Sequence, residues 1–234
     1  MPASDGLRLE GLTCHLGAFR LRVEACVRVG ERVAILGASG SGKSTLLGAI
    51  AGFVTPASGR ILWQDGDIAG RRAAERPVSI LFQDGNLFPH LDVAQNVGLA
   101  LRTDLRLSAA DRARVDGVLD RVGLGGLGGR KPADLSGGQQ GRAALARMLL
   151  RDKPLVLLDE PFAALDPGLR REMAELLTDL WRERGLTYLM ATHDLRDAER
   201  VCDRIWLMQD GDIVLDAPLA GLRDAPPSAL HDWL

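Results

Sequence analysis

The amino-acid sequence predicts an α/β fold built around a parallel β-sheet. Four runs of strand length are apolar throughout, at residues 33–36, 155–158, 188–191 and 205–208. Strands of this kind are typical of a sheet that is covered on both faces. Stretches with helical spacing separate the runs, which indicates parallel strands joined by crossover helices.

The other elements are predicted from local patterns. Residues 7–29 alternate apolar and polar side chains in two bursts, which indicates short antiparallel strands with one solvated face. Residues 45–51 form an apolar helix. From about 92 to 150 the apolar spacing is helical and is broken by glycine and proline clusters at 123–129 and 131–132, which indicates a separate helical lobe. The sequence QDGD at 209–212 is typical of a hairpin turn.

The composition fits one compound globular domain. A chain of 234 residues allows one sizeable core, or a core with a smaller lobe. The hydrophobic fraction of 46% and the charged fraction of 26% are those of globular proteins, which excludes a disordered chain and a fibrous repeat. The formal net charge is -2 and no five like charges adjoin, so the sequence shows no nucleic-acid-binding footprint.

Neither membrane insertion nor disulfide bonding is predicted. No stretch reaches the roughly 18 to 20 apolar residues of a membrane-spanning helix, and the N-terminus lacks the pattern of a signal peptide. We therefore expect a cytosolic chain whose membrane role comes through partners. Cys14, Cys26 and Cys202 are scattered without C-x-x-C spacing, which argues against a disulfide framework or a zinc site. We expect all three to be buried or half-buried thiols.

A phosphate-binding loop is predicted after the first buried strand. The sequence GASGSGKS at 37–44 matches G-x-x-x-x-G-K-[ST], and an apolar helix follows it. Such a loop points backbone N–H groups at phosphate oxygens, and the helix N-terminus adds partial positive charge. Lys43 would bind the outer phosphates and the Ser44 hydroxyl would ligate Mg²⁺. The candidate phosphate-binding residues are Gly37, Ala38, Ser39, Gly40, Ser41, Gly42, Lys43, Ser44 and Thr45. The alternative is a glycine-rich turn without a ligand.

Two acids follow the buried run at 155–158. Open parallel sheets bind ligands at the carboxyl ends of their strands, where Asp159 and Glu160 stand. We expect Asp159 to hold Mg²⁺ through its water shell and Glu160 to polarise the attacking water as general base. The alternative is that both acids are merely solvated.

A second anion site is predicted at residues 135–139, LSGGQ, just before a helical run. A serine hydroxyl and glycine N–H groups at a helix start favour phosphate. The segment resembles the signature of ABC-type ATPases. Two phosphate-binding ends on one chain suggest a head-to-tail dimer in which each phosphate loop faces the other copy's signature. A plain N-cap would explain the serine alone. The candidate residues are Ser136, Gly137, Gly138 and Gln139.

The resemblance to ABC-type ATPases implies further roles. Gln83, in LFQD at 81–84, resembles the glutamine that reaches Mg²⁺ and the attacking water. Asp166, in ALD at 164–166, resembles the D-loop residue that crosses the dimer seam. His193 resembles the switch histidine that contacts the γ phosphate, whereas a lone histidine is more often structural. The implied ligands are ATP and Mg²⁺.

The resemblance also implies a fold and its division. It is a P-loop NTPase (RecA-like) core with an antiparallel β subdomain and an inserted helical subdomain. The core would comprise about 1–91 and 151–234, and the helical subdomain about 92–150.

Two departures from the family pattern are visible. The window in which the family carries an aromatic residue against adenine holds Cys14, His15 and Leu16, so that His15 or Phe19 would have to substitute. After the signature, importers commonly carry Arg-Gln where this chain has Gln140 and Gly141. A glycine there costs about 1 kcal/mol of helix propensity relative to alanine.

Residues 76–99 are similar to bacterial importers, and most similar to thiamine import ATPases. Polyamine, iron and molybdate import ATPases share part of the run, and a soluble ABC ATPase or an exporter subunit are more distant alternatives. The resemblance implies a homodimer at the cytoplasmic face of the inner membrane, an integral membrane permease and, indirectly, a periplasmic solute-binding protein. Candidate permease contacts, or alternatively residues packed within the helical lobe, are Leu87, Phe88, Leu91 and Val97.

Overall fold

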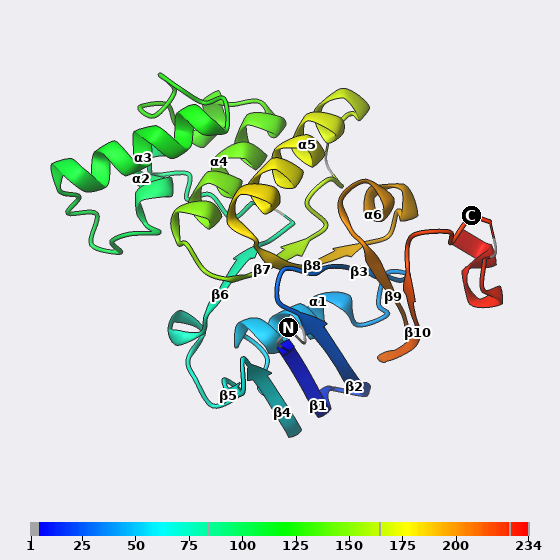
Figure 1. The fold of residues 1–234 in the computed structure, drawn as a ribbon. Helices are drawn as coiled ribbons and strands as arrows, with labels where there is room; N and C mark the ends of the chain where they lie inside the picture. Colours follow the sequence, from blue (N-terminus) through cyan, green and yellow to red (C-terminus); the bar gives the residue numbers. More distant parts are fainter. Residues whose placement is uncertain (1–4, 84, 164, 225, 234) are drawn as a thin grey trace.

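A six-stranded sheet forms the centre of the molecule (Figure 1). The computed structural model describes residues 5–83, 85–163, 165–224 and 226–233. The strand order is β10-β9-β3-β8-β7-β6, in which β10 pairs antiparallel with β9 and the other pairs are parallel. The bounds are β3 Arg32–Leu36, β6 Val78–Leu81, β7 Leu155–Asp159, β8 Thr187–Thr192, β9 Arg204–Gln209 and β10 Asp212–Pro218. The four buried strands and the hairpin predicted from the sequence are therefore confirmed.

A second sheet is antiparallel and has the order β2-β1-β4-β5. The long hairpin of β1 Asp5–Leu16 and β2 Phe19–Arg28 confirms the alternating pattern, and β4 Ser58–Trp63 and β5 Gly66–Asp67 extend it. Cys26 lies on the outer face of β2 and is exposed, while Cys14 and Cys202 are buried. The expectation that all three thiols are at least half-buried was therefore wrong for Cys26, because β2 alternates between a buried and a solvated face.

Helix α1 Lys43–Ala51 lies between the two sheets (Figure 1). Its Leu46, Leu47 and Ile50 are fully buried in one hydrophobic cluster with Leu12 of the hairpin and Ile35 of β3. A helix buried between two sheets has to be apolar around most of its surface, as this sequence is. Burial on both sides fixes the position of the helix N-terminus, where Lys43 and Ser44 lie.

The opposite face of the central sheet is covered by α5 Pro167–Arg184 and α6 Leu195–Val201. Met173, Leu177 and Leu180 of α5 share a buried cluster with Leu158 of β7 and Met190 of β8. The central sheet therefore has helices on both faces, as its apolar strands require. Three short 3₁₀ helices complete the described elements, at Ala73–Glu75, Pro132–Asp134 and Ser228–Trp233.

A group of helices lies at the β6 edge of the sheet, next to α5 (Figure 1). It comprises α2 Val93–Gly98, α3 Ala109–Arg121 and α4 Gly137–Leu150, which pack on one another. We propose that this group is the inserted helical subdomain of about 92–150 and that about 1–91 and 151–234 form the core. Among the described residues, no helix is long and apolar enough to cross a membrane.

The candidate permease contacts differ in their exposure. Phe88 is 46% exposed, and Leu87 and Leu91 are half-buried. Val97 is fully buried in the core shared by the helices, so for this residue the alternative of packing inside the lobe holds. The loop that carries Leu87, Phe88 and Leu91 is held by the buried side chain of Asn96. This side chain accepts a hydrogen bond from Phe88 N and donates to the carbonyls of Phe88 and Leu91.

Candidate active site

The predicted phosphate loop connects the end of β3 to the start of α1. Gly40 and Gly42 have φ angles of 82° and 106°, in the left-handed region that favours glycine. A Cβ atom on Gly42 would lie 2.8 Å from the Phe19 ring. Helix α1 begins without a side-chain cap, so its first N–H groups are left for an external acceptor. The loop thus has the shape and the donors of an anion cradle.

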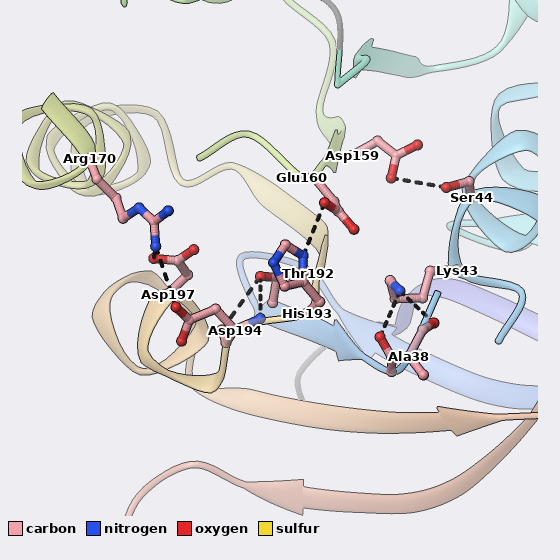
Figure 2. A network of polar contacts seen from close by, with 11 residues as sticks. Ala38, Lys43, Ser44, Asp159, Glu160, Arg170, Thr192, His193, Asp194 and Asp197 are labelled. Carbon is pink, nitrogen blue, oxygen red and sulfur yellow. Dashed lines mark hydrogen bonds and ion pairs between the residues drawn. The ribbon is translucent and has the colours of Figure 1, made fainter. Parts of the chain in front are cut away.

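Lys43 is buried at the base of this loop. It is 5% exposed, and its Nζ donates to the carbonyl oxygens of Gly37 at 2.7 Å and Ala38 at 3.0 Å (Figure 2). Burial lowers the pKa of Lys43, and the negative charges of Glu160 and Asp159 oppose that shift. The Ser41 hydroxyl is also buried, and it has no hydrogen-bond partner among the residues that the structure describes. Buried polar groups around a glycine cradle fit a phosphate ligand.

Ser44 and Asp159 form the second part of the site. The Ser44 hydroxyl donates to Asp159 Oδ1 at 3.2 Å, which joins the first turn of α1 to the last residue of β7 (Figure 2). Burial raises the pKa of Asp159, whereas the hydrogen bond from Ser44 lowers it. A hydroxyl oxygen and a carboxylate oxygen at this spacing are ligands that Mg²⁺ prefers, so these residues fit the predicted metal.

Glu160 and His193 meet at the ends of neighbouring parallel strands. Glu160 follows β7 and His193 follows β8, and His193 Nδ1 lies 3.1 Å from Glu160 Oε2 (Figure 2). Glu160 has a φ of 47°, and its backbone N–H donates to Ala191 O at 3.0 Å. A non-glycine residue in the left-handed region is uncommon and costs energy, which the surrounding hydrogen bonds offset. The strained backbone aims the carboxylate at the histidine.

A cavity of about 460 Å³ lies between the phosphate loop and Glu160, and Asp159 and His193 are not among the residues that line it. Its lining residues are Leu16, Phe19, Ser39, Gly40, Gly42, Lys43, Ser44, Thr45, Gln83 and Glu160. The predicted phosphate loop, the predicted base and the predicted glutamine therefore share one hollow. Leu16 and Phe19 of the hairpin form its apolar end, whereas the exposed His15 is not among the lining residues.

The predicted signature lies outside this cavity. Ser136 caps α4, because its hydroxyl accepts from Gln139 N at 3.3 Å, and its N–H donates to Gln139 Oε1 at 3.0 Å. Within one chain, Ser136 is thus the N-cap that the alternative interpretation expected. Gly137 lines a different cavity of about 200 Å³, whose walls include Gln83 and Glu160. Gly138 packs so closely on Leu169 of α5 that a Cβ atom would overlap it.

Asp166 also lies apart from the phosphate loop. Its carboxylate caps α5 by accepting from the N–H groups of Gly168 and Leu169, both at 3.0 Å. Ala164 of the same predicted motif, and Asp84 beside Gln83, lie outside the described residues. Arg170, which lies one turn into α5, belongs to no motif that the sequence shows. The sequence feature that could have pointed to Arg170 is its spacing of four residues from Asp166, which places both residues on one helix face.

A glycine-rich cradle, a buried lysine and two acids at the end of the parallel strand β7 define the class of this protein. It is a P-loop nucleoside triphosphatase.

Comparisons with known proteins narrow the class. Residues 21–163 match the family model described as ABC transporter. A relative from Jannaschia sp., named thiamine import ATP-binding protein ThiQ, is 56% identical over 228 residues, which cover 97% of this chain and 100% of that protein. A protein of the same name from Yersinia pseudotuberculosis is 48% identical over 218 residues, with 93% and 92% covered. The chain belongs to the ABC transporter family.

Solved structures agree with this fold. The dimeric ATP-binding cassette MJ0796, described in a post-hydrolysis state bound to ADP and Pi, is 32% identical with a TM-score of 0.81, and the match covers 91% of this chain and 98% of that one. The cbiO1 protein from Clostridium perfringens, described as part of the transporter complex cbiONQ, is 32% identical with a TM-score of 0.83, with 94% and 92% covered. The predicted fold class is confirmed.

Proposed function

We propose that this chain is the ATP-binding and ATP-hydrolysing subunit of a bacterial importer that takes up thiamine or its phosphates through a separate permease. The nucleotide cavity supports the ATPase part of the proposal, because it combines a phosphate cradle with Glu160, whose carboxylate His193 contacts from outside the lining. One observation carries the choice of solute: relatives named thiamine import ATP-binding protein match nearly the whole chain at 48% to 56% identity.

The residues of the cavity have the following proposed roles. The loop from Gly37 to Thr45 binds the phosphates through backbone N–H groups and Lys43. Ser44, Asp159 and Gln83 hold Mg²⁺, which when bound neutralises charge on the phosphates. Glu160 accepts a proton from the attacking water as general base. His193, at 3.1 Å from Glu160, fixes that carboxylate and faces the γ phosphate.

We further propose that the working unit is a homodimer. Ser136 is at an exposed helix start and lies outside the cavity of its own chain, so a second copy would have to supply the signature to each nucleotide. The signature residues Ser136, Gly137, Gly138 and Gln139, together with Asp166, would complete the partner's site.

The permease would dock beside the helical subdomain. Phe88 is 46% exposed there, and Phe53, which is 60% exposed, contacts Phe82 with ring centroids 5.6 Å apart. Exposed aromatic side chains of this kind are enriched at protein interfaces. We propose that this contact holds the subunit at the cytoplasmic face of the inner membrane, and that a periplasmic binding protein delivers the solute.

Transport coupling tests the choice of solute. The chain is reconstituted in vesicles with the permease encoded beside it and the matching binding protein, and ATP hydrolysis is measured with thiamine, a polyamine, ferric iron or molybdate. We expect thiamine to stimulate hydrolysis several-fold and the others to have no effect. Stimulation by one of the other solutes alone would assign the importer to that solute.

The Glu160→Gln variant tests the general base. Glutamine keeps the shape of the side chain but cannot accept a proton, so ATP binding should persist while steady-state hydrolysis falls at least about a hundredfold, within the range for loss of general-base catalysis. ATP should then hold the variant as a dimer in size-exclusion chromatography with light scattering. Hydrolysis at the wild-type rate would remove Glu160 from this role.

A further inference from the structure

An arginine of α5 reaches across to the loop that carries His193. Arg170 Nη1 lies 3.3 Å from Asp194 Oδ2 and 3.6 Å from Asp197 Oδ1 (Figure 2). Both acids belong to the residues that directly follow His193, at the start of α6. Arg170 lies in the first turn of α5, where its backbone N–H makes the ordinary helical hydrogen bond to Asp166 O at 2.9 Å. Arg170 therefore joins the Asp166 turn to the His193 loop within one chain.

Asp194 connects Arg170 to the backbone next to His193. Its Oδ1 caps α6 by accepting from Arg196 N at 2.9 Å, while its Oδ2 faces Arg170. Its backbone N–H donates to the hydroxyl of Thr192 at 3.1 Å. The residues on both sides of His193 in the chain are thus held to each other, and His193 Nδ1 lies 3.1 Å from Glu160 Oε2 although the imidazole is otherwise largely exposed.

Asp197 is a buried acid that has Arg170 as a positively charged neighbour. The residue is 4% exposed, and its Oδ1 has no hydrogen-bond partner among the described residues. Burial raises the pKa of Asp197, and the charge of Arg170 opposes that shift. The side chain of Arg196 also contacts Asp194, at 3.4 Å, but it is 77% exposed, so solvent screens that pair. Arg170, at 28% exposed, is the cation on the buried side of the cluster.

We propose that Arg170 is a positioning residue for ATP hydrolysis: by holding Asp194, it keeps His193 in contact with Glu160. The inference rests on the proposed function, because it assumes that hydrolysis proceeds through Glu160. Arg170 does not line the nucleotide cavity, so its removal slows turnover without weakening nucleotide binding.

The test compares Arg170→Ala and Arg170→Lys with a matched control. Arg223→Ala breaks another ion pair to α6, in which Arg223 Nε lies 2.6 Å from Glu199 Oε1, away from His193. We expect kcat of Arg170→Ala to fall about tenfold with an unchanged KM for ATP, and Arg170→Lys to recover part of the loss. Arg223→Ala should behave like the wild type. A wild-type kcat in Arg170→Ala would overturn the proposal.

Two double variants separate positioning from stability. In a His193→Ala background, Arg170→Ala should cause no further loss of kcat, because the residue acts through the histidine. Asp197→Asn removes the buried charge that Arg170→Ala leaves unpaired, so this pair should recover its melting temperature while kcat stays low. Additive losses in the first pair, or recovery of kcat in the second, would show a merely structural role.

A spectroscopic readout distinguishes failure of this inference from failure of the proposed function. The chain has four histidines, so the imidazole signals can be assigned by NMR with one substitution for each. Arg170→Ala should shift the His193 signal, and Arg223→Ala should not. An unmoved His193 signal would overturn the inference, whether or not the protein hydrolyses ATP. If the wild type hydrolyses ATP no faster than a variant that lacks Lys43, the proposed function is overturned instead.

Discussion

Lys43 is a buried cation whose pKa depends on its neighbours. Burial lowers its pKa, and Glu160 and Asp159 on the facing strand end raise it again. Burial raises the pKa of Asp159, the hydrogen bond from Ser44 lowers it, and the charges of Glu160 and Lys43 act in opposite directions, Glu160 raising it and Lys43 lowering it. The charges of Lys43 and the two acids therefore interact before any ligand binds, and phosphate and Mg²⁺ would enter a site already organised for them.

Phe19 offers a residue-scale prediction about the nucleotide base. It lines the cavity, and its ring lies against Gly42, whereas His15 is exposed and outside the lining. We expect Phe19→Ala to raise the KM for ATP about three- to tenfold, with a smaller effect on kcat, because about 1 kcal/mol of apolar contact is lost. His15→Ala serves as the matched control. If His15→Ala weakens ATP binding and Phe19→Ala does not, the base lies elsewhere.

At this scale the sequence indicated the residues of the phosphate cavity but not those that support them. Lys43, Ser44 and Glu160 belong to motifs in which spacing and chemistry are joined, and they lie together in the cavity. Arg170 and Asp197 belong to no such motif. Their relation depends on the angle at which α5 and α6 cover the sheet, which one sequence does not encode locally.

Contact between α4 and α5 links the signature to the Asp166 turn. Gly138 lies against Leu169, and a Cβ on Gly141 would be in ordinary contact with Met173 at 3.6 Å. The glycine at 141, which departs from the family pattern, therefore sits where α4 passes close to α5. The starts of α4 and α5 therefore pack against each other. Both would act on the partner's nucleotide.

Gly138→Ala tests this close approach. The added methyl group would overlap Leu169, so we expect a loss of about 1–3 kcal/mol in the free energy of unfolding, measured by urea denaturation. Gly137→Ala is the matched control, because a Cβ there has nothing within 4 Å. Leu169→Ala should recover part of the loss in a double variant. Equal stability of the two alanine variants would show that the helices separate without strain.

The elements that the sequence did not predict are those with mixed patterns. In β4, the first half is exposed and the second half buried, so its residues neither alternate nor form a long apolar run. In β6, Ser79 interrupts the apolar run although it is 1% exposed. The continuous apolar runs of β3, β7 and β8 were predicted because both faces of the sheet are covered.

On the scale of the whole molecule, the phosphate loop and the signature are separate surfaces. The loop opens into a cavity with the hairpin and the strand ends, and the signature begins α4 at the side of the helical subdomain. Neither surface completes the other within one chain among the described residues. We propose that two copies of the chain bring the phosphate loop and the signature together around ATP. Nucleotide binding and subunit association are then coupled.

Cross-linking across the dimer tests this claim most directly. Ser39 and Gly137 are exposed and are replaced by cysteines in a Glu160→Gln variant, with the exposed Cys26 changed to serine. We expect a short thiol-reactive cross-linker to join two chains through residues 39 and 137 when ATP and Mg²⁺ are present, and not in their absence. An ATP-loaded protein in which these two positions never cross-link between chains would contradict it.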